Sequence, residues 1–100
     1  MSAGLDGKGM PVAWNDGFAG SSVNARWAPP VFNNGLDPDT TEGAVNLVCA
    51  FPNMRAEYLR VEPPGIPTAF WRSLGPSHNV FVIESFIDEL AAAAKEDAVA

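Results

Sequence analysis

Arg72, Ser77 and His78 are the residues whose types and spacing could do chemistry, and all three lie in the run of residues 67–79. A long apolar helix is predicted over about residues 77–95, with Ser77 as its N-cap. A helix start offers unpaired N–H groups and a partial positive charge, so with Arg72 nearby it could hold an anion. Every helix has such a start, however. A structural ion pair or a cap for backbone carbonyls is the simpler role for Arg72.

Catalysis by this run alone is not expected. Ser77 and His78 are sequence neighbours, which rarely point toward each other as a nucleophile and its base do, and no Gly-x-Ser-x-Gly elbow is present. Glu84 and Asp88 share a helix face, but a solvated helix surface explains them more simply than an acid–base pair does. The run also lacks the spacing of a dinucleotide-binding or Walker loop. We therefore assign no catalytic residue.

The composition excludes several classes of protein. The chain has 100 residues, of which 47% are hydrophobic and 18% charged, so it is a modest domain or a piece of a larger one. Its net charge of −6 and its scattered basic residues argue against nucleic-acid binding. Cys49 and His78 are its only cysteine and histidine, so neither a zinc site nor a four-thiolate cluster is expected, and Cys49 is expected to be a small core residue.

No targeting or membrane-spanning segment is predicted. No stretch approaches the roughly 20 apolar residues of a membrane helix, and the first residues lack the basic and apolar regions of a signal peptide. The compartment, cytoplasmic or periplasmic, stays open.

The elements that must position the run of residues 67–79 follow from turn signals and periodicity. We expect a hairpin over residues 2–14, an irregular segment over 15–43, strands over about 44–62, a turn over 67–77 and the helix over about 77–95. One helix face carries an apolar stripe, made of Val82, Ile83, Phe86, Ile87 and Leu90. The fold class is therefore α+β, with short strands and long loops followed by one C-terminal helix. Trp27 and Phe32 in the irregular segment would need burial, which hints at a missing partner surface.

Two segments resemble a known family. Residues 67–75 are Pro-Thr-Ala-Phe-Trp-Arg-Ser-Leu-Gly, and residues 84–91 are Glu-Ser-Phe-Ile-Asp-Glu-Leu-Ala. Together they resemble the molybdopterin-binding large subunit of the xanthine dehydrogenase/aldehyde oxidase family, and within it most the isoquinoline 1-oxidoreductase beta subunit. Weaker matches lie in order along the chain, at residues 3–6, 11–14, 42–44 and 52–55, whereas residues 15–41 match poorly.

The resemblance implies oxidative hydroxylation of a nitrogen heteroaromatic or an aldehyde at a molybdenum centre, with electrons leaving through an iron–sulfur subunit. Carried over by position, Arg72 lies beside the molybdenum centre and Leu74 lines the substrate pocket. Gly75, Pro76 and Ser77 form a turn against the cofactor, so the implied cofactor-binding residues are Arg72, Gly75 and Ser77. The purine-oxidising branch has Gly-Phe where this chain has Ser73-Leu74, which argues against a purine substrate.

Family members are several times longer than this chain, so the resemblance covers an internal slice of one molybdopterin-binding domain. The catalytic glutamate base and most pterin-binding segments are absent from it. The remainder of the large subunit would be a partner, and the isolated chain is expected to hold no cofactor and to be inactive. The alternatives are a non-catalytic orphan domain that associates through its apolar helix, and a small anion-binding module that uses the helix start.

Overall fold

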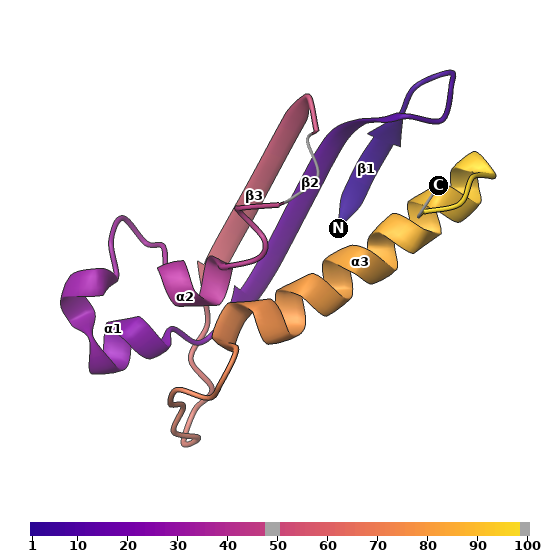
Figure 1. The fold of residues 1–100 in the computed structure, drawn as a ribbon. Coiled ribbons are helices and arrows are strands. Elements are labelled where there is room, and N and C mark those ends of the chain that lie inside the picture. The colour runs from indigo at the N-terminus through magenta and orange to yellow at the C-terminus, as the bar shows by residue number, and fades with distance from the viewer. Residues whose placement is uncertain (48–50, 99–100) are drawn as a thin grey trace.

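The structure is a computed structural model that describes residues 1–47 and 51–98. It has an α+β fold that ends in one long C-terminal helix, and this confirms the predicted fold class (Figure 1). The elements along the chain are β1 (Ser2–Leu5), β2 (Pro11–Gly20), α1 (Val23–Trp27), the 3-10 helix η1 (Pro29–Val31), α2 (Pro38–Thr41), β3 (Asn53–Arg60) and α3 (Leu74–Ala94).

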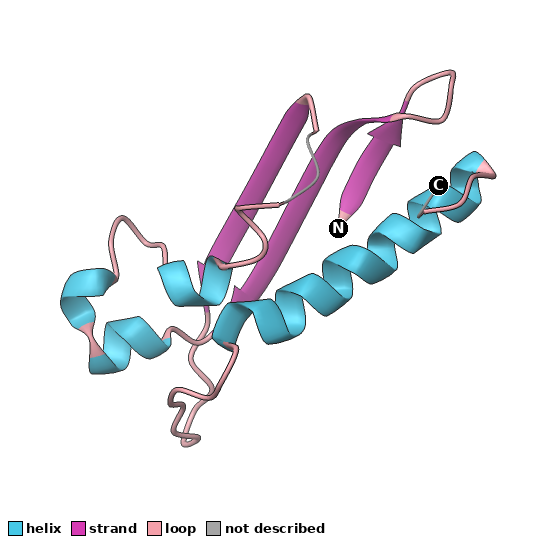
Figure 2. Ribbon diagram, viewed as in Figure 1, coloured by secondary structure: helices cyan, strands magenta, loops and turns pink. Residues whose placement is uncertain are grey.

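The three strands form one mixed sheet in the order β1-β2-β3. Strands β1 and β2 form the hairpin expected over residues 2–14, and the carboxylate of Asp6 closes its turn by accepting from the backbone N–H groups of Lys8 and Met10, at 2.8 and 3.0 Å. Strand β3 pairs with β2 in parallel, with Trp14 opposite Met54. Helix α3 runs along one face of this sheet (Figure 2).

The segment of residues 15–43 has more regular structure than its breakers indicated. Strand β2 continues past residue 14, where the predicted hairpin ends, to Gly20. Every second side chain, Trp14, Asp16 and Phe18, keeps facing the same side of the sheet. Two short helices and η1 follow. The single irregular loop that we predicted there is therefore wrong.

Of the predicted strands over about 44–62, the described residues form one, β3. Residues 44–47 form no strand, and residues 48–50, which include Cys49, lie outside the described residues. The last helix begins at Leu74 rather than near residue 77. Pro76 is compatible with this earlier start, since the first turn of a helix does not use the N–H group that proline lacks.

The core lies between α3 and the inner face of the sheet. Among the described residues its fully buried apolar members are Trp14, Ala44 and Ile83. The indole of Trp14 stacks on Phe51 at 4.8 Å between ring centroids and meets Phe86 edge-on at 5.4 Å. Most of the predicted helical stripe packs here, but Val82 is exposed.

The molecule is long for its size. Its radius of gyration is 15.4 Å, whereas a compact domain of this length has one of about 13 Å. Large apolar side chains lie on the surface, among them Trp71 at 81% and Phe81 at 72% exposure. The core is thus thin, and aromatic side chains lie on the surface. In the part of the chain that the structure describes, no helix combines the length and apolarity needed to cross a membrane.

Candidate functional site

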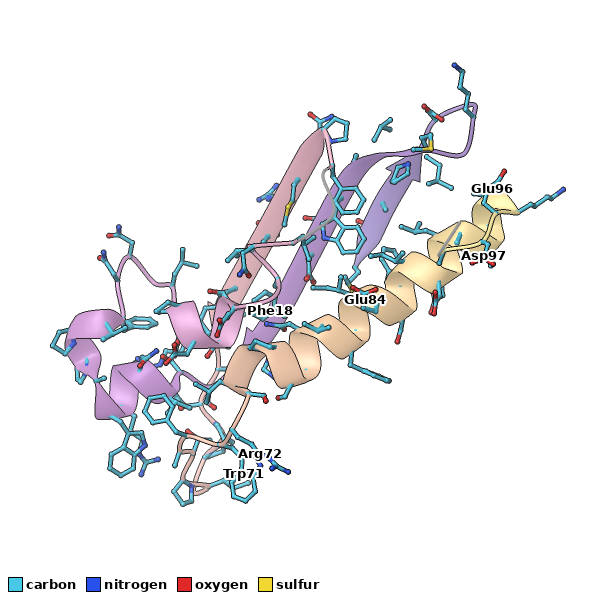
Figure 3. The ribbon with its side chains drawn as sticks, viewed as in Figure 1. Phe18, Trp71, Arg72, Glu84, Glu96 and Asp97 are labelled. Carbon is cyan, nitrogen blue, oxygen red and sulfur yellow. The ribbon has the colours of Figure 1, made fainter. Side chains whose placement is uncertain are left out.

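The residues that the resemblance selected line one cleft of about 420 Å³ at the start of α3. Arg72, Leu74, Gly75 and Ser77 form its helix side. The opposite side comes from the end of β2 and from α2, with Phe18 and Asp39 among its residues. Trp71 and Arg72 lie together on the loop that leads into α3, while Phe18 lies on the sheet side (Figure 3). The cleft thus combines a guanidinium group with aromatic side chains.

The backbone turns abruptly between Arg72 and α3. Ser73 and Leu74 have φ angles of +63° and +29°, in the left-handed region that residues other than glycine rarely adopt. Ser73 is the N-cap of α3, and its side chain makes no capping hydrogen bond. Two consecutive strained residues cost of order 1–3 kcal/mol each, so the surrounding structure must hold them in place.

Ser77 does not cap the helix, contrary to the sequence-based prediction. It lies inside the first turn of α3, and its hydroxyl group donates to the carbonyl oxygen of Leu74 at 2.7 Å. Gly75 and Pro76 likewise belong to the helix and not to a preceding turn. The predicted turn over residues 67–77 therefore ends at Ser73, because the left-handed residues 73 and 74 reverse the chain earlier than Gly75-Pro76 would.

Helices α2 and α3 touch at Gly75. A Cβ atom built on Gly75 would lie 2.3 Å from the carbonyl oxygen of Asp39 and 2.8 Å from that of Glu42, closer than any side chain can approach. One turn further along α3, the Asn79 amide donates to the carbonyl oxygens of Thr40 and Glu42 at 2.8 and 2.9 Å. Glycine allows the close contact and asparagine satisfies the carbonyls at the end of α2, so the two residues fix one side of the cleft.

The start of α2 is fixed by a buried carboxylate, that of Asp37. Asp37 has 0% exposure and caps α2 by accepting from the backbone N–H groups of Asp39 and Thr40, at 2.9 and 3.1 Å. It also accepts from the Ser22 hydroxyl at 2.5 Å and from the Asn24 side-chain amide at 2.7 Å. Burial raises the pKa of Asp37, but these hydrogen bonds outweigh burial, and the net result is a pKa below its ordinary value.

Several residues of the cleft, among them Phe18, Asp39 and Trp71, were not selected from the sequence. Phe18 was missed because β2 was ended too early, although its spacing from Trp14 continues the strand period. Asp39 comes from a segment expected to be irregular. Trp71 lies exposed on the loop before α3, and His78, which the sequence singled out for its chemistry, lines the cleft from α3. No pattern in the sequence indicated that α2 would lie opposite the helix start.

Trp27 and Phe32, which were expected to need burial, are covered only in part. Trp27 is exposed, but its ring nitrogen donates to the Thr68 carbonyl oxygen at 2.9 Å and the Arg26 guanidinium lies over its ring. The Arg60 guanidinium lies over Phe32, 5.5 Å from the ring centroid. Cation–π contacts partly replace the missing apolar cover.

Within residues 1–47 and 51–98, no group of histidine, cysteine and acidic side chains is arranged to hold a metal ion. Comparisons with family models, curated proteins and solved structures gave no match for this chain.

Proposed function

We propose that this chain forms one wall of the active site in the molybdopterin-binding subunit of a molybdenum hydroxylase. The family would be that of xanthine dehydrogenase and aldehyde oxidase, and the nearest branch that of the isoquinoline 1-oxidoreductase beta subunit. One observation carries the proposal: Arg72, Leu74, Gly75 and Ser77, selected from motifs alone, line the same cleft. The substrate would be a nitrogen heteroaromatic or an aldehyde. The partners would be the rest of the subunit and an iron–sulfur subunit.

The chemistry of the cleft suits one edge of a pterin cofactor. The Arg72 guanidinium presents N–H donors in a planar fork, and the Ser77 hydroxyl can still accept a hydrogen bond because its proton is directed at Leu74. Phe18 and Trp71 offer aromatic surface against which a flat ring can pack. Asp39 would repel an anionic group, so the charged end of the cofactor would lie toward Arg72.

The cofactor, when bound, would supply the two-electron oxidation that hydroxylates the substrate. The chain's own residues would bind and orient. Arg72 would hold the cofactor edge, and Leu74 would restrict the substrate by its branched side chain, in place of the aromatic residue of the purine-oxidising branch. No residue in this chain is proposed to move a proton in the reaction.

The shape of the molecule supports the proposal of an incomplete site. One side of the cleft ends at Trp71, which is mostly exposed, and the core contains few fully buried apolar side chains among the described residues. Further protein would have to cover the cleft and the outer face of α3. The isolated chain is accordingly proposed to be inactive and to hold no molybdenum.

The proposal is tested by the genomic neighbourhood and by the metal content. We expect the flanking reading frames to encode the remaining family segments or an iron–sulfur subunit. Co-expression with them should give a complex with stoichiometric molybdenum, whereas the chain alone should contain none. Within that complex, Arg72→Ala should lower turnover with the fold retained, and Lys8→Ala at the distant hairpin turn is the matched control. Complete, unrelated genes on both sides, or normal turnover of the Arg72→Ala complex, would overturn the proposal.

An orphan, non-catalytic domain is the second candidate, because one stretch of α3 is apolar and exposed. Val80, Phe81 and Val82 all lie on the surface. Exposed apolar side chains of this kind favour association with another apolar surface. This candidate predicts association that is lost in Phe81→Ser and requires no neighbouring molybdenum-enzyme genes.

A further inference from the structure

The outer edge of β3 is open to another strand. Strand β3 is the last strand of the sheet, and β2 is the only described strand that pairs with it. It is eight residues long, contains no proline, and exposes six of its side chains, all but those of Ala56 and Tyr58. Proteins usually protect such an edge with a short strand, a proline, charged side chains, a bulge or a cover, because its free N–H and C=O groups pair readily with a second chain. Strand β3 does carry charges, at Arg55, Glu57 and Arg60, so their arrangement decides which chain can pair with it.

The pairing of β3 with β2 decides which backbone groups face outward. The Val61 N–H group donates to the Gly20 carbonyl oxygen of β2 at 2.8 Å. Because backbone direction alternates along a strand, the odd-numbered residues of β3 bond to β2. The N–H and C=O groups of Met54, Ala56 and Tyr58 therefore point away from the sheet. A new antiparallel neighbour must pair through these even-numbered residues.

Two copies of β3 meeting about a twofold axis have only a few allowed registers. An axis at Arg55 would place Arg55 opposite its own copy, and an axis at Glu57 would place Glu57 opposite its own copy; both juxtapose like charges. An axis at Ala56 pairs Ala56 with Ala56 and Met54 with Tyr58 as hydrogen-bonded pairs. It also places Arg55 of each copy opposite Glu57 of the other.

Of these three registers, only the one centred on Ala56 places opposite charges of the two β3 strands next to each other. Arg55 and Glu57 already form an exposed ion pair along one strand, on the sheet face that α3 does not cover. In the Ala56-centred register each of them gains a second, opposite neighbour, while Met54 meets the ring of Tyr58 on the other face. The chain as a whole carries a net charge of −6, but β3 holds two arginines and one glutamate, so the contact itself is not acidic.

We propose that the edge of β3 is a docking surface for a second copy of this chain, which adds its own β3 antiparallel about Ala56. A continuous sheet then runs through both copies. This surface is separate from the cleft and from the exposed Val80–Val82 stretch of α3. It does not rest on the proposed function, because it needs only the described residues.

Charge exchange tests the register directly. The unaltered chain should have a solution mass of twice 10.6 kDa by light scattering, and dimerisation should weaken at high salt. Arg55→Glu alone and Glu57→Arg alone should each give a mass of 10.6 kDa, since each places like charges opposite one another. The double variant Arg55→Glu/Glu57→Arg should dimerise again. An equimolar mixture of the two single variants should form a heterodimer, because both cross-strand pairs are then of opposite sign.

Circular dichroism of each variant shows whether it is folded, and rescue by the double variant and by mixing excludes loss of folding as the cause. Phe81→Ser is the control for the other exposed apolar surface and should remain dimeric. The proposal is wrong if the chain is monomeric at every concentration, if the single charge reversals remain dimeric, or if Phe81→Ser alone abolishes the dimer.

Discussion

Gly75 in α3 lies directly against the backbone of Asp39 in α2, so close that a Cβ atom at position 75 would be 2.3 Å from the Asp39 carbonyl oxygen. Both residues line the cleft, so this contact joins the two walls of the candidate site. The obstructing atom belongs to the backbone of a capped helix and cannot swing aside as a flexible side chain would. The contact therefore determines both the stability of the fold and the width of the cleft.

Gly75→Ala should destabilise the protein. Alanine normally stabilises a helix interior relative to glycine by roughly 0.5–1 kcal/mol, but here the added methyl group must push α2 away from α3. We expect a net loss of about 1–3 kcal/mol, measured as the free energy of unfolding in urea. Gly17→Ala is the matched control, because a Cβ atom there would meet nothing within 4 Å. Equal stability of the two variants would contradict the close contact.

Asp37→Asn should cost stability at neutral pH. The asparagine amide group would face the donors of Ser22 and Asn24, which now bond to a carboxylate. We expect a loss of at least about 2 kcal/mol from the cap and the unsatisfied donors together. Because the folded-state pKa of Asp37 lies below its ordinary value of 3.8, its contribution is complete above that pH and is lost as the pH falls through the folded-state pKa. The difference between Asp37→Asn and the unaltered chain should therefore shrink in acid. A constant difference from pH 7 to pH 2 would show that the carboxylate charge is not what stabilises α2.

The sequence alone was sufficient to predict the elements that depend on local signals. The Asp6 turn with its flanking strands and the long C-terminal helix are set by turn residues and by periodicity, and the structure contains both. The position of the helix start was not predictable, because it depends on Ser73 and Leu74 adopting left-handed angles, which only tertiary contacts impose. The helix side of the cleft was found from a motif. Phe18 and Asp39 were not, since a parallel strand pairing and a contact between α2 and α3 bring them there.

Asp16→Asn should stabilise the protein at neutral pH. Asp16 is buried on the inner face of β2, where burial raises its pKa, with a partial offset from the positive charge of the N-terminus. A raised folded-state pKa means that the charged form is less favourable in the fold than in the unfolded chain, so stability falls as the pH rises through that pKa. Asparagine removes this cost and leaves the size of the side chain unchanged.

The gain in the melting temperature of Asp16→Asn should be present at pH 7 and should vanish below the ordinary pKa of 3.8, where both chains are uncharged at this position. Asp88→Asn, at an exposed position on α3, is the control and should show no comparable gain. Loss of stability in Asp16→Asn at pH 7 would mean that the Asp16 charge is needed in the fold.

Ser73→Gly tests whether the left-handed turn before α3 positions Arg72 or serves only the fold. Ser73 and Lys95 both have left-handed backbone angles, φ +63° and +62°, at opposite ends of α3. Glycine relieves this strain but also gives the unfolded chain more freedom, so each substitution should raise stability by at most about 1 kcal/mol. Only Ser73 adjoins Arg72. In the proposed molybdenum-enzyme complex, Ser73→Gly should lower turnover by loosening the position of Arg72, whereas Lys95→Gly should leave turnover unchanged. Equal turnover of the two variants would show that the left-handed turn serves the fold alone and does not position Arg72.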